Sequence, residues 1–434
     1  MEGALIGFII VMLLIVLGVP IAASFGVLAI FLTLWFDADP SYLMPTMFIK
    51  IREVVLLAVP LFVLLGNLMD ASGLADRLVE FVHSIIGHIK GGLGAVTVAT
   101  CALFGAISGT DSAAIACIGT VMIPRMERNG YPRGHATALV GCAGILGQLV
   151  PPSVPMIFYA MVTANSIPAC WAATLGPAVV MVVIYSLLNR FAIRRLPVKV
   201  APKPPSFKEY AAAIGKSAFK AIPVLLLPVI VLGGIYGGIV TPTEGACLGV
   251  FYILVAACGF YRSVGFSQLR QATISAAVTS GVILLMTFFI LMSSKILVLE
   301  GVTQQLTAWI LATSPNVYVT LLLLNVVLII IGMMMDDLSG TLLAAAVLYP
   351  IATSAGVHPL HFAAIVGVNL GLGTVTPPCA PMLYLAGRIG HSTAEEYMKP
   401  AMFFMWVGML PLVLVTTYWP ALSLTLPGLL GFVH

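Results

Sequence analysis

The chain has 434 residues, of which 60% are hydrophobic and only 8% are charged, with a formal net charge of +4. Soluble domains carry about 25% charged residues, so this composition excludes a soluble globular protein. It predicts an all-α polytopic membrane protein whose apolar runs cross a hydrocarbon core of about 30 Å several times. We expect the lipid bilayer as its environment and no nucleic-acid partner. The seven Cys residues lack C-x-x-C or Cys/His spacing and are predicted to be small buried side chains.

The first half, residues 1–189, begins with two apolar runs that Pro20 separates, 4–19 and 20–36. A predicted span follows at 54–70. Residues 74–89 mix charged and apolar side chains, which indicates an amphipathic helix at the membrane interface. Residues 168–189 are predicted to cross again.

A polar segment interrupts the apolar stretch 91–126. Its predicted site residues are Ser108, Gly109, Thr110, Asp111 and Ser112. A helix can break at bilayer depth only where protein, water or a bound ion satisfies the free backbone groups. Basic residues flank the stretch on both sides, and the positive-inside rule therefore places both flanks in the cytoplasm. The stretch is predicted to be a re-entrant hairpin.

The next apolar stretch, 134–163, is predicted to be a broken helix. Two consecutive prolines, Pro151 and Pro152, remove two backbone donors and clash with the preceding turn. Gln148 and Ser153 flank this break, and Gln148, Pro151 and Ser153 are predicted site residues.

A basic, proline-containing segment at 190–219 is predicted to be a cytoplasmic linker to the second half, residues 220–434. There the same plan returns, with a re-entrant hairpin at about 318–350 and a broken helix at 360–386. The predicted site residues of this half are Asp336, Asp337, Ser339, Gly340, Thr341, Gly373, Thr374, Thr376 and Pro377.

A shift of 226 residues aligns the two halves without gaps from Pro124 to Ala160. It superimposes prolines, glycines and His135 with His361, and it carries Asp111 onto Asp337. Each half is predicted to have five crossings and one hairpin, and an odd number of crossings inverts the second half. Inverted repeats with broken helices near the midplane are typical of secondary transporters.

Hydroxyl groups and exposed main-chain carbonyls at such breaks are the hard oxygen ligands that Na⁺ prefers. Sodium is therefore the expected coupling ion, and no organic cofactor is expected. Helix packing or capping is the alternative role for the hydroxyls. For Asp111 and Asp337, capping and ion attraction are weighed equally. His135 and His361, which begin the two broken helices, are predicted to form interfacial hydrogen bonds between helices, with a proton relay as the less favoured alternative.

The sequence resembles the large membrane subunit of tripartite ATP-independent periplasmic (TRAP) transporters over essentially its whole length. The resembling segments are Val59-Pro60-Leu61-Phe62, Gly66-Asn67-Leu68-Met69, Ser108-Gly109-Thr110, Ile118-Gly119, Pro151-Pro152-Ser153 and Thr376-Pro377-Pro378. One departure is Cys379-Ala380, where many members have a small apolar residue followed by Gly.

This resemblance implies an elevator-type, sodium-driven importer of an organic acid, such as a carboxylate or a sialic acid, in the bacterial inner membrane. It also implies two partners, a small four-helix membrane subunit and a periplasmic substrate-binding protein. In the family, sodium binds between each hairpin tip and the break of the following helix.

Two other functions remain open from the residues alone. One is a stand-alone anion or sodium/proton antiporter of related fold. The other, an intramembrane aspartyl protease using Asp111 and Asp337, is disfavoured because the two carboxylates enter on separate hairpin tips, whereas that chemistry needs a shared proton. We expect no enzymatic activity.

Overall fold

The computed structural model describes residues 2–200, 206–261, 263–313 and 316–433, and within these ranges it contains helices and no strands. The helices are α1 (Glu2–Val16), α2 (Ile21–Trp35), α3 (Pro40–Ile51), η1 (Val54–Leu57), α4 (Ala58–Ala71), α5 (Ala75–Ile86), α6 (Gly92–Ser108), α7 (Asp111–Arg128), α8 (Arg133–Gly144), α9 (Leu146–Leu149), α10 (Val154–Thr163), α11 (Ile167–Ala192), α12 (Phe207–Tyr236), α13 (Pro242–Leu254), η2 (Val255–Phe260), α14 (Phe266–Leu299), α15 (Val302–Thr313), α16 (Val317–Met334), α17 (Asp337–Leu343), η3 (Ala344–Leu348), α18 (Tyr349–Ser354), α19 (Pro359–Val375), α20 (Pro381–Ile389), α21 (Ala394–Phe404), η4 (Met405–Met409), α22 (Leu410–Tyr418) and α23 (Ala421–Leu429).

In the first half, the helices break where the polar and proline-containing segments predict. Helix α6 ends at Gly109, whose φ of 68° lies in the left-handed region that glycine tolerates, and α7 starts at Asp111. The next helix stops at Leu149, and α10 starts at Val154 at an angle of 42° to it.

The second half repeats this arrangement. Helix α16 ends before Met335, α17 begins at Asp337, and a π-helical turn, η3, joins α17 to α18. Helix α19 ends at Val375 and α20 begins at Pro381. Both diproline peptides, Pro151-Pro152 and Pro377-Pro378, are cis.

Glycines hold each hairpin against its broken helix. A Cβ on Gly147 would lie 2.3 Å from the carbonyl oxygen of Thr110, and a Cβ on Gly109 would lie 2.3 Å from that of Pro152. In the second half, a Cβ on Gly373 would lie 2.5 Å from the Cα of Gly332. The backbones therefore touch directly at both places, and only glycine leaves room for them.

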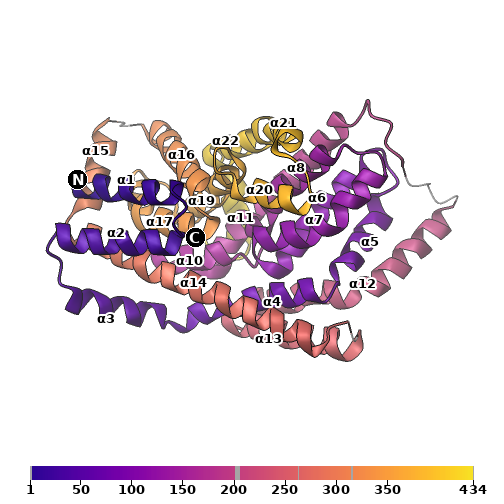
Figure 1. Cartoon of the computed structure of the whole chain (residues 1–434), viewed down its shortest axis with the longest axis horizontal. Coiled ribbons are helices and arrows are strands. Elements are labelled where there is room, and N and C mark those ends of the chain that lie inside the picture. Colours follow the sequence, from indigo (N-terminus) through magenta and orange to yellow (C-terminus); the bar gives the residue numbers. More distant parts are fainter. Residues whose placement is uncertain (1, 201–205, 262, 314–315, 434) are drawn as a thin grey trace.

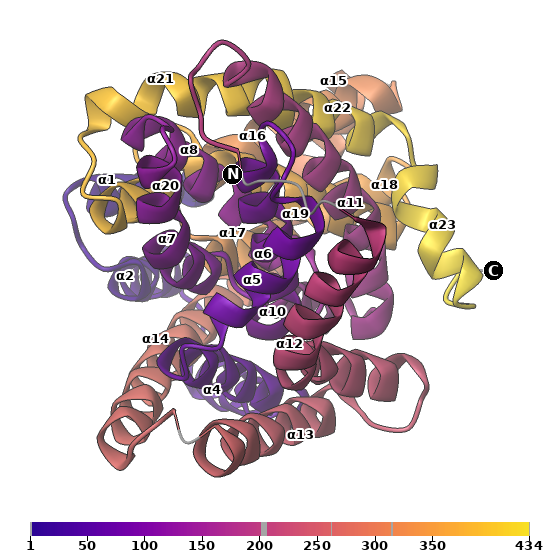
Figure 2. The same cartoon turned by 90° about the vertical axis from the view of Figure 1, so that its right-hand side faces the viewer.

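The molecule is built from two groups of helices. Helices α4, α13 and α14 pack together along one edge, and α12 packs on α13 (Figure 1). Seen from the side, this edge lies apart from the group that contains the hairpins and broken helices, and α5 runs between the two groups (Figure 2). Side-chain contacts fix α5 to α12, since the hydroxyl of Tyr210 donates to the carbonyl of Ile85 at 2.8 Å.

Among the described residues, seven helices are long and apolar enough to cross a membrane, or eight if the bent pair around Pro151 is one span. Helices α1 and α2 occupy the two predicted N-terminal runs but have only 15 residues each. Helix α16 has 18 residues and is long and apolar enough to cross a membrane, whereas the sequence predicted it to be one arm of a re-entrant hairpin. The predicted repeat boundaries at 189 and 220 stay a prediction.

The predicted linker at 190–219 needs one correction, because α12 begins inside it at Phe207. The side chain of Ser206 accepts a hydrogen bond from the backbone N–H of Glu209 and so caps this helix. Residues 201–205 of the linker lie outside the described residues.

Candidate functional site: a polar cavity at the helix breaks

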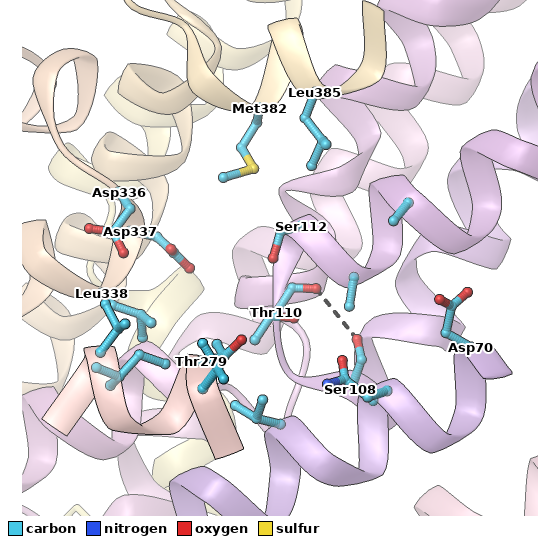
Figure 3. A pocket seen from close by; sticks show the side chains of 18 residues that line it. Asp70, Ser108, Thr110, Ser112, Thr279, Asp336, Asp337, Leu338, Met382 and Leu385 are labelled. Carbon is cyan, nitrogen blue, oxygen red and sulfur yellow. Dashed lines mark hydrogen bonds between the residues drawn. The ribbon is translucent and has the colours of Figure 1, made fainter. Parts of the chain in front are cut away.

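A cavity of about 570 Å³, here called the central cavity, lies where the two hairpin tips approach α4 and α14. Figure 3 shows Asp336 and Asp337 on one side of it and the α6–α7 tip with Ser108, Thr110 and Ser112 facing them. Its lining residues are Val63, Gly66, Asn67, Asp70, Ser108, Thr110, Ser112, Ala113, Ala116, Val278, Thr279, Val282, Ile283, Asp336, Asp337, Leu338, Met382 and Leu385.

The first tip exposes its hydroxyl groups to the central cavity. Ser108 Oγ forms only a long hydrogen bond, 3.4 Å, to the carbonyl of Thr110. Asp111 is buried, and its Oδ1 accepts the N–H of Ser112 at 2.6 Å. No described residue supplies a hydrogen-bond partner for Asp111 Oδ2, so one buried carboxylate oxygen is left unsatisfied at this tip.

The second tip is linked to the first repeat through Gln148. With its amide nitrogen directed at the second tip, Gln148 donates to Asp337 Oδ2 at 3.3 Å and accepts the N–H of Gly371 at 3.3 Å. Residues 148 and 337 come from different halves, so this contact joins the two repeats at their centre. Within the described chain, Thr341 Oγ1 is buried here without a hydrogen-bond partner.

Other predicted site residues serve as helix caps. Asp336 caps α17 by accepting the N–H of Ser339, and the Ser339 hydroxyl donates to the same carboxylate. Ser153 caps α10 by accepting the N–H of Met156 at 3.4 Å. Asp111 and Asp337, in contrast, are the first residues of α7 and α17 and do not cap them.

The remaining predicted residues lie behind the cavity. The hydroxyls of Thr374 and Thr376 donate to carbonyls within α19, at 3.0 and 2.6 Å. Gly340 packs on α19, where an added Cβ would lie 2.9 Å from a methyl carbon of Leu370. Pro151 and Pro377 form the breaks themselves, and Gly373 packs against α16. These residues position the tips and do not line the central cavity.

The cavity also contains polar residues that the sequence prediction missed, namely Asn67 and Asp70 from α4 and Thr279 from α14. Asn67 and Asp70 are three residues apart and therefore share one helix face. A polar pair in an otherwise apolar span is itself a functional signal, and Asn67 belongs to a motif already noted for its resemblance.

The charged residues that line the central cavity, among those described, are all acidic. Asp70, Asp336 and Asp337 line it, and none of its described lining residues is Lys or Arg. Carboxylates at this depth are costly unless a cation or a proton neutralises them.

The two repeat histidines lie elsewhere: His135 Nε2 is 2.9 Å from Asn189 Oδ1, and His361 Nε2 is 2.8 Å from the carbonyl of Thr416. Their predicted role in hydrogen bonding between helices is thereby confirmed.

Broken helices that meet at a polar cavity within a multi-span helical chain define a secondary membrane transporter. The match to a family model identifies the class further. Residues 8–422 match the model for the tripartite ATP-independent periplasmic transporter, DctM component. The chain belongs to this family of TRAP large permease subunits.

Its relatives are similar over most of their length. The chain is 34% identical to the C4-dicarboxylate TRAP transporter large permease protein DctM of Pseudomonas aeruginosa, covering 88% of each chain. It is 31% identical to the sialic acid TRAP transporter large permease protein SiaM of Vibrio cholerae, covering 96% of each. Its fold is similar to that of the YdaH transporter of Alcanivorax borkumensis, with a TM-score of 0.63 at 17% identity over 90% of this chain and 91% of that one.

The isethionate TRAP transporter permease protein DctMQ of Oleidesulfovibrio alaskensis is 31% identical. The match covers 96% of this chain but only 65% of that protein.

Proposed function

We propose that this chain is the large subunit of a sodium-coupled importer of a small organic acid. The acid is delivered by a periplasmic binding protein, and a small four-helix membrane subunit completes the transporter in the bacterial inner membrane. The observation that carries the proposal is that each hairpin tip, at a helix break, has a buried oxygen without a hydrogen-bond partner among the described residues. These oxygens are Asp111 Oδ2 at the first tip and Thr341 Oγ1 at the second, and other such atoms lie away from the tips.

Sodium fits these tips on chemical grounds. Na⁺ is a hard cation that binds carboxylate, hydroxyl and carbonyl oxygens, and both helix breaks leave such groups without intrahelical partners. A bound cation would also neutralise the excess of carboxylates around the central cavity. Because the cavity has no Lys or Arg in its described lining, an organic anion needs such a cation to offset its own charge.

The substrate class follows from the relatives. Their names specify a C4-dicarboxylate, a sialic acid and isethionate, all small organic acids. A cavity of about 570 Å³ accommodates molecules of this size. Its wall is apolar on the side of Val278, Val282 and Ile283 and polar at the tips, which suits an acid with a hydrocarbon or sugar backbone.

The arrangement of helices supports an elevator movement. The cavity lies between the group that carries both tips and the edge formed by α4 and α14, so sliding of one group along the other carries a bound substrate across the membrane. Basic residues of α7, α8 and the segment after α11 lie at one end of the molecule, where Lys90 donates to the carbonyl of Arg194 at 2.9 Å. By the positive-inside rule, this basic end faces the cytoplasm.

The test measures uptake in proteoliposomes that contain both partner subunits. We expect an imposed Na⁺ gradient to drive uptake, and Ser108→Ala to raise the Na⁺ concentration for half-maximal uptake about tenfold, since one interaction with a charged group contributes about 1.5 kcal/mol. The matched control is Ser24→Ala, which removes a buried hydroxyl from α2, outside the cavity.

Full uptake under a proton gradient without sodium would contradict the proposal. An unchanged sodium dependence in both Ser108→Ala and Asp111→Asn would remove the first tip from the ion site.

A further inference from the structure

A second cavity, of about 500 Å³, lies at the basic end of the molecule between α7 and the start of α5. Its lining residues are Asp76, Thr120, Val121, Pro124, Arg125, Arg128 and Asn129. Two guanidinium groups therefore face one small space, and the central cavity has none in its described lining.

The two cavities follow one another along α7. Ser112 and Ala116 line the central cavity, and Thr120, Pro124 and Arg128 line the second one. Positions four residues apart differ by only about 40° around a helix, so Ala116 and Thr120 are neighbours on its surface. The drift accumulates to about 160° between Ser112 and Arg128, so the lining positions wind around α7. From Ala116 to Thr120 the helix rises about 6 Å, so a short step along α7 separates the cavities.

The opposite wall is also shared. Asp70, near the end of α4, lines the central cavity, and Asp76, in the first turn of α5, lines the second one. Cys117 of α7 is buried between these two levels. Small side chains at Ala113 and Ala116 continue the path on the α7 side.

Neither arginine forms an ion pair with a carboxylate of the described residues, although Asp76 lines the same cavity and reduces its net positive charge. Over the described ranges, the ion pairs within 4.0 Å are Lys50–Glu53 and Glu127–Arg133. The one carboxylate beside the arginines on α7, Glu127, is thus already paired with Arg133. Arg125 also lies near α5, since it lines the second cavity together with Asp76 of that helix.

We propose that the second cavity is an anion-binding site through which the organic acid leaves the central cavity, with Arg125 and Arg128 as its ligands. This rests on the proposed function. The acid moves along α7, between that helix and the α4–α5 junction, from a cavity where only a bound cation offsets its charge. It then reaches two fixed positive charges, which attract it away from the carboxylates and sodium at the tips.

The experiment measures reaction rates at Thr120→Cys, since residue 120 is exposed in the second cavity. Purified protein in phosphatidylcholine nanodiscs, open to reagent on both faces, is treated with an anionic sulfonatoethyl or a cationic trimethylammonioethyl methanethiosulfonate. Mass spectrometry quantifies the product at position 120. Each rate is divided by the rate of the same reagent with a small free thiol. After this correction, the positive potential of the second cavity is expected to make the anionic reagent react roughly tenfold faster than the cationic one.

Adding Arg125→Gln and Arg128→Gln should bring this ratio close to one, whereas Lys216→Gln, which removes an exposed charge from α12, should leave it unchanged. Succinate, N-acetylneuraminate or isethionate should slow the anionic reagent in the parent and not in the double arginine variant. Each single arginine variant is also measured. If the thermal unfolding midpoint shows that the double variant folds poorly, the single variants are compared with the parent instead.

Equal rates for both reagents, or a preference that survives loss of both arginines, would overturn the proposal. So would a preference that disappears when phosphatidylglycerol is added, since a lipid headgroup then occupies the site. None of these measurements depends on sodium or on transport, so a failure of sodium coupling is distinguishable from a failure of this site.

Discussion

At the scale of single residues, the polar side chains of the helix breaks have two different roles. Asp336 and Ser153 accept backbone N–H groups at the starts of helices, and the Ser339 hydroxyl donates to the Asp336 carboxylate. Asp111 and Thr341 are as deeply buried but have an atom that no described residue satisfies. A buried polar atom without a partner costs about 1–3 kcal/mol. Such atoms also occur away from the helix breaks, for example at Tyr185 and Ser423. What distinguishes Asp111 and Thr341 is therefore their position at the hairpin tips.

Ala380, at the second helix break, has a left-handed backbone conformation that a substitution can test. Its φ of 36° lies in the left-handed region, which costs a residue with a Cβ about 1 kcal/mol. We expect Ala380→Gly to be at least about 1 kcal/mol less destabilising than Ala386→Gly. Both changes remove one fully buried methyl group, but residue 386 lies inside helix α20.

The measurement is the thermal unfolding midpoint of both variants in the same detergent. Equal destabilisation by the two changes would mean that position 380 does not hold a left-handed backbone in solution.

At the scale of helices, direct backbone contacts at glycines fix each hairpin to its broken helix. We expect Gly147→Ala and Gly373→Ala to destabilise the fold by about 1–3 kcal/mol each, the usual range for overpacking. The added methyl meets backbone atoms, at 2.3 Å in one case and 2.5 Å in the other, and these cannot rotate away as side chains do.

The control is Gly281→Ala in α14, where an added Cβ meets no heavy atom within 4 Å. It should stabilise its helix by up to about 1 kcal/mol. Thermal unfolding of the three variants decides the matter, and a stable Gly147→Ala protein would show that the tip contact is looser than described.

The helix breaks could be predicted from sequence because their causes are local. Two consecutive prolines at 151–152 and 377–378 remove adjacent backbone donors and strongly disfavour a continuous helix, and glycine at 109 permits the left-handed conformation that ends α6. The same local logic could not choose between cap and ligand for Ser339, since either role uses the same hydroxyl. Asn67, Asp70 and Thr279 were missed because they reach the site only through packing of α4 and α14 against the tips. The polar pair in an apolar span is a local sign of function, but which cavity it lines is tertiary information.

At the scale of the whole molecule, the central cavity lies between two groups of helices, the group with the hairpin tips and the edge that contains α4 and α14. Residues of the hairpin tips form one wall, and α4 and α14 form the other (Figure 3). Helix α5 is bound to α12 through the hydrogen bond between Ser84 and Ser217, 2.7 Å, and leads directly into α6. It therefore connects the edge of the molecule to the hairpin body. If the proposed movement occurs, we expect Gly87 and Gly91, between α5 and α6, to absorb it.

A crosslink between the two groups of helices tests this movement directly. A Cβ on Gly66 of α4 would lie 3.3 Å from the Cβ of Ser108 at the first tip, close enough for a disulfide after a small adjustment. We expect the pair Gly66→Cys and Ser108→Cys to lose nearly all uptake on oxidation and to recover its own reduced rate with dithiothreitol. The reason is that the tip then cannot slide along α4.

The matched control joins two helices of the same body, because a Cβ on Gly141 of α8 would lie 3.2 Å from the Cβ of Ala386 in α20. Oxidation of Gly141→Cys with Ala386→Cys should leave uptake within about twofold of its reduced rate, since a disulfide inside one rigid body constrains nothing that must move. Uptake is compared before and after oxidation in proteoliposomes with both partner subunits, and mass spectrometry confirms each disulfide. Full uptake by the oxidised Gly66–Ser108 pair would mean that α4 travels with the tip, and the boundary between fixed and moving helices would then have to lie beyond α4.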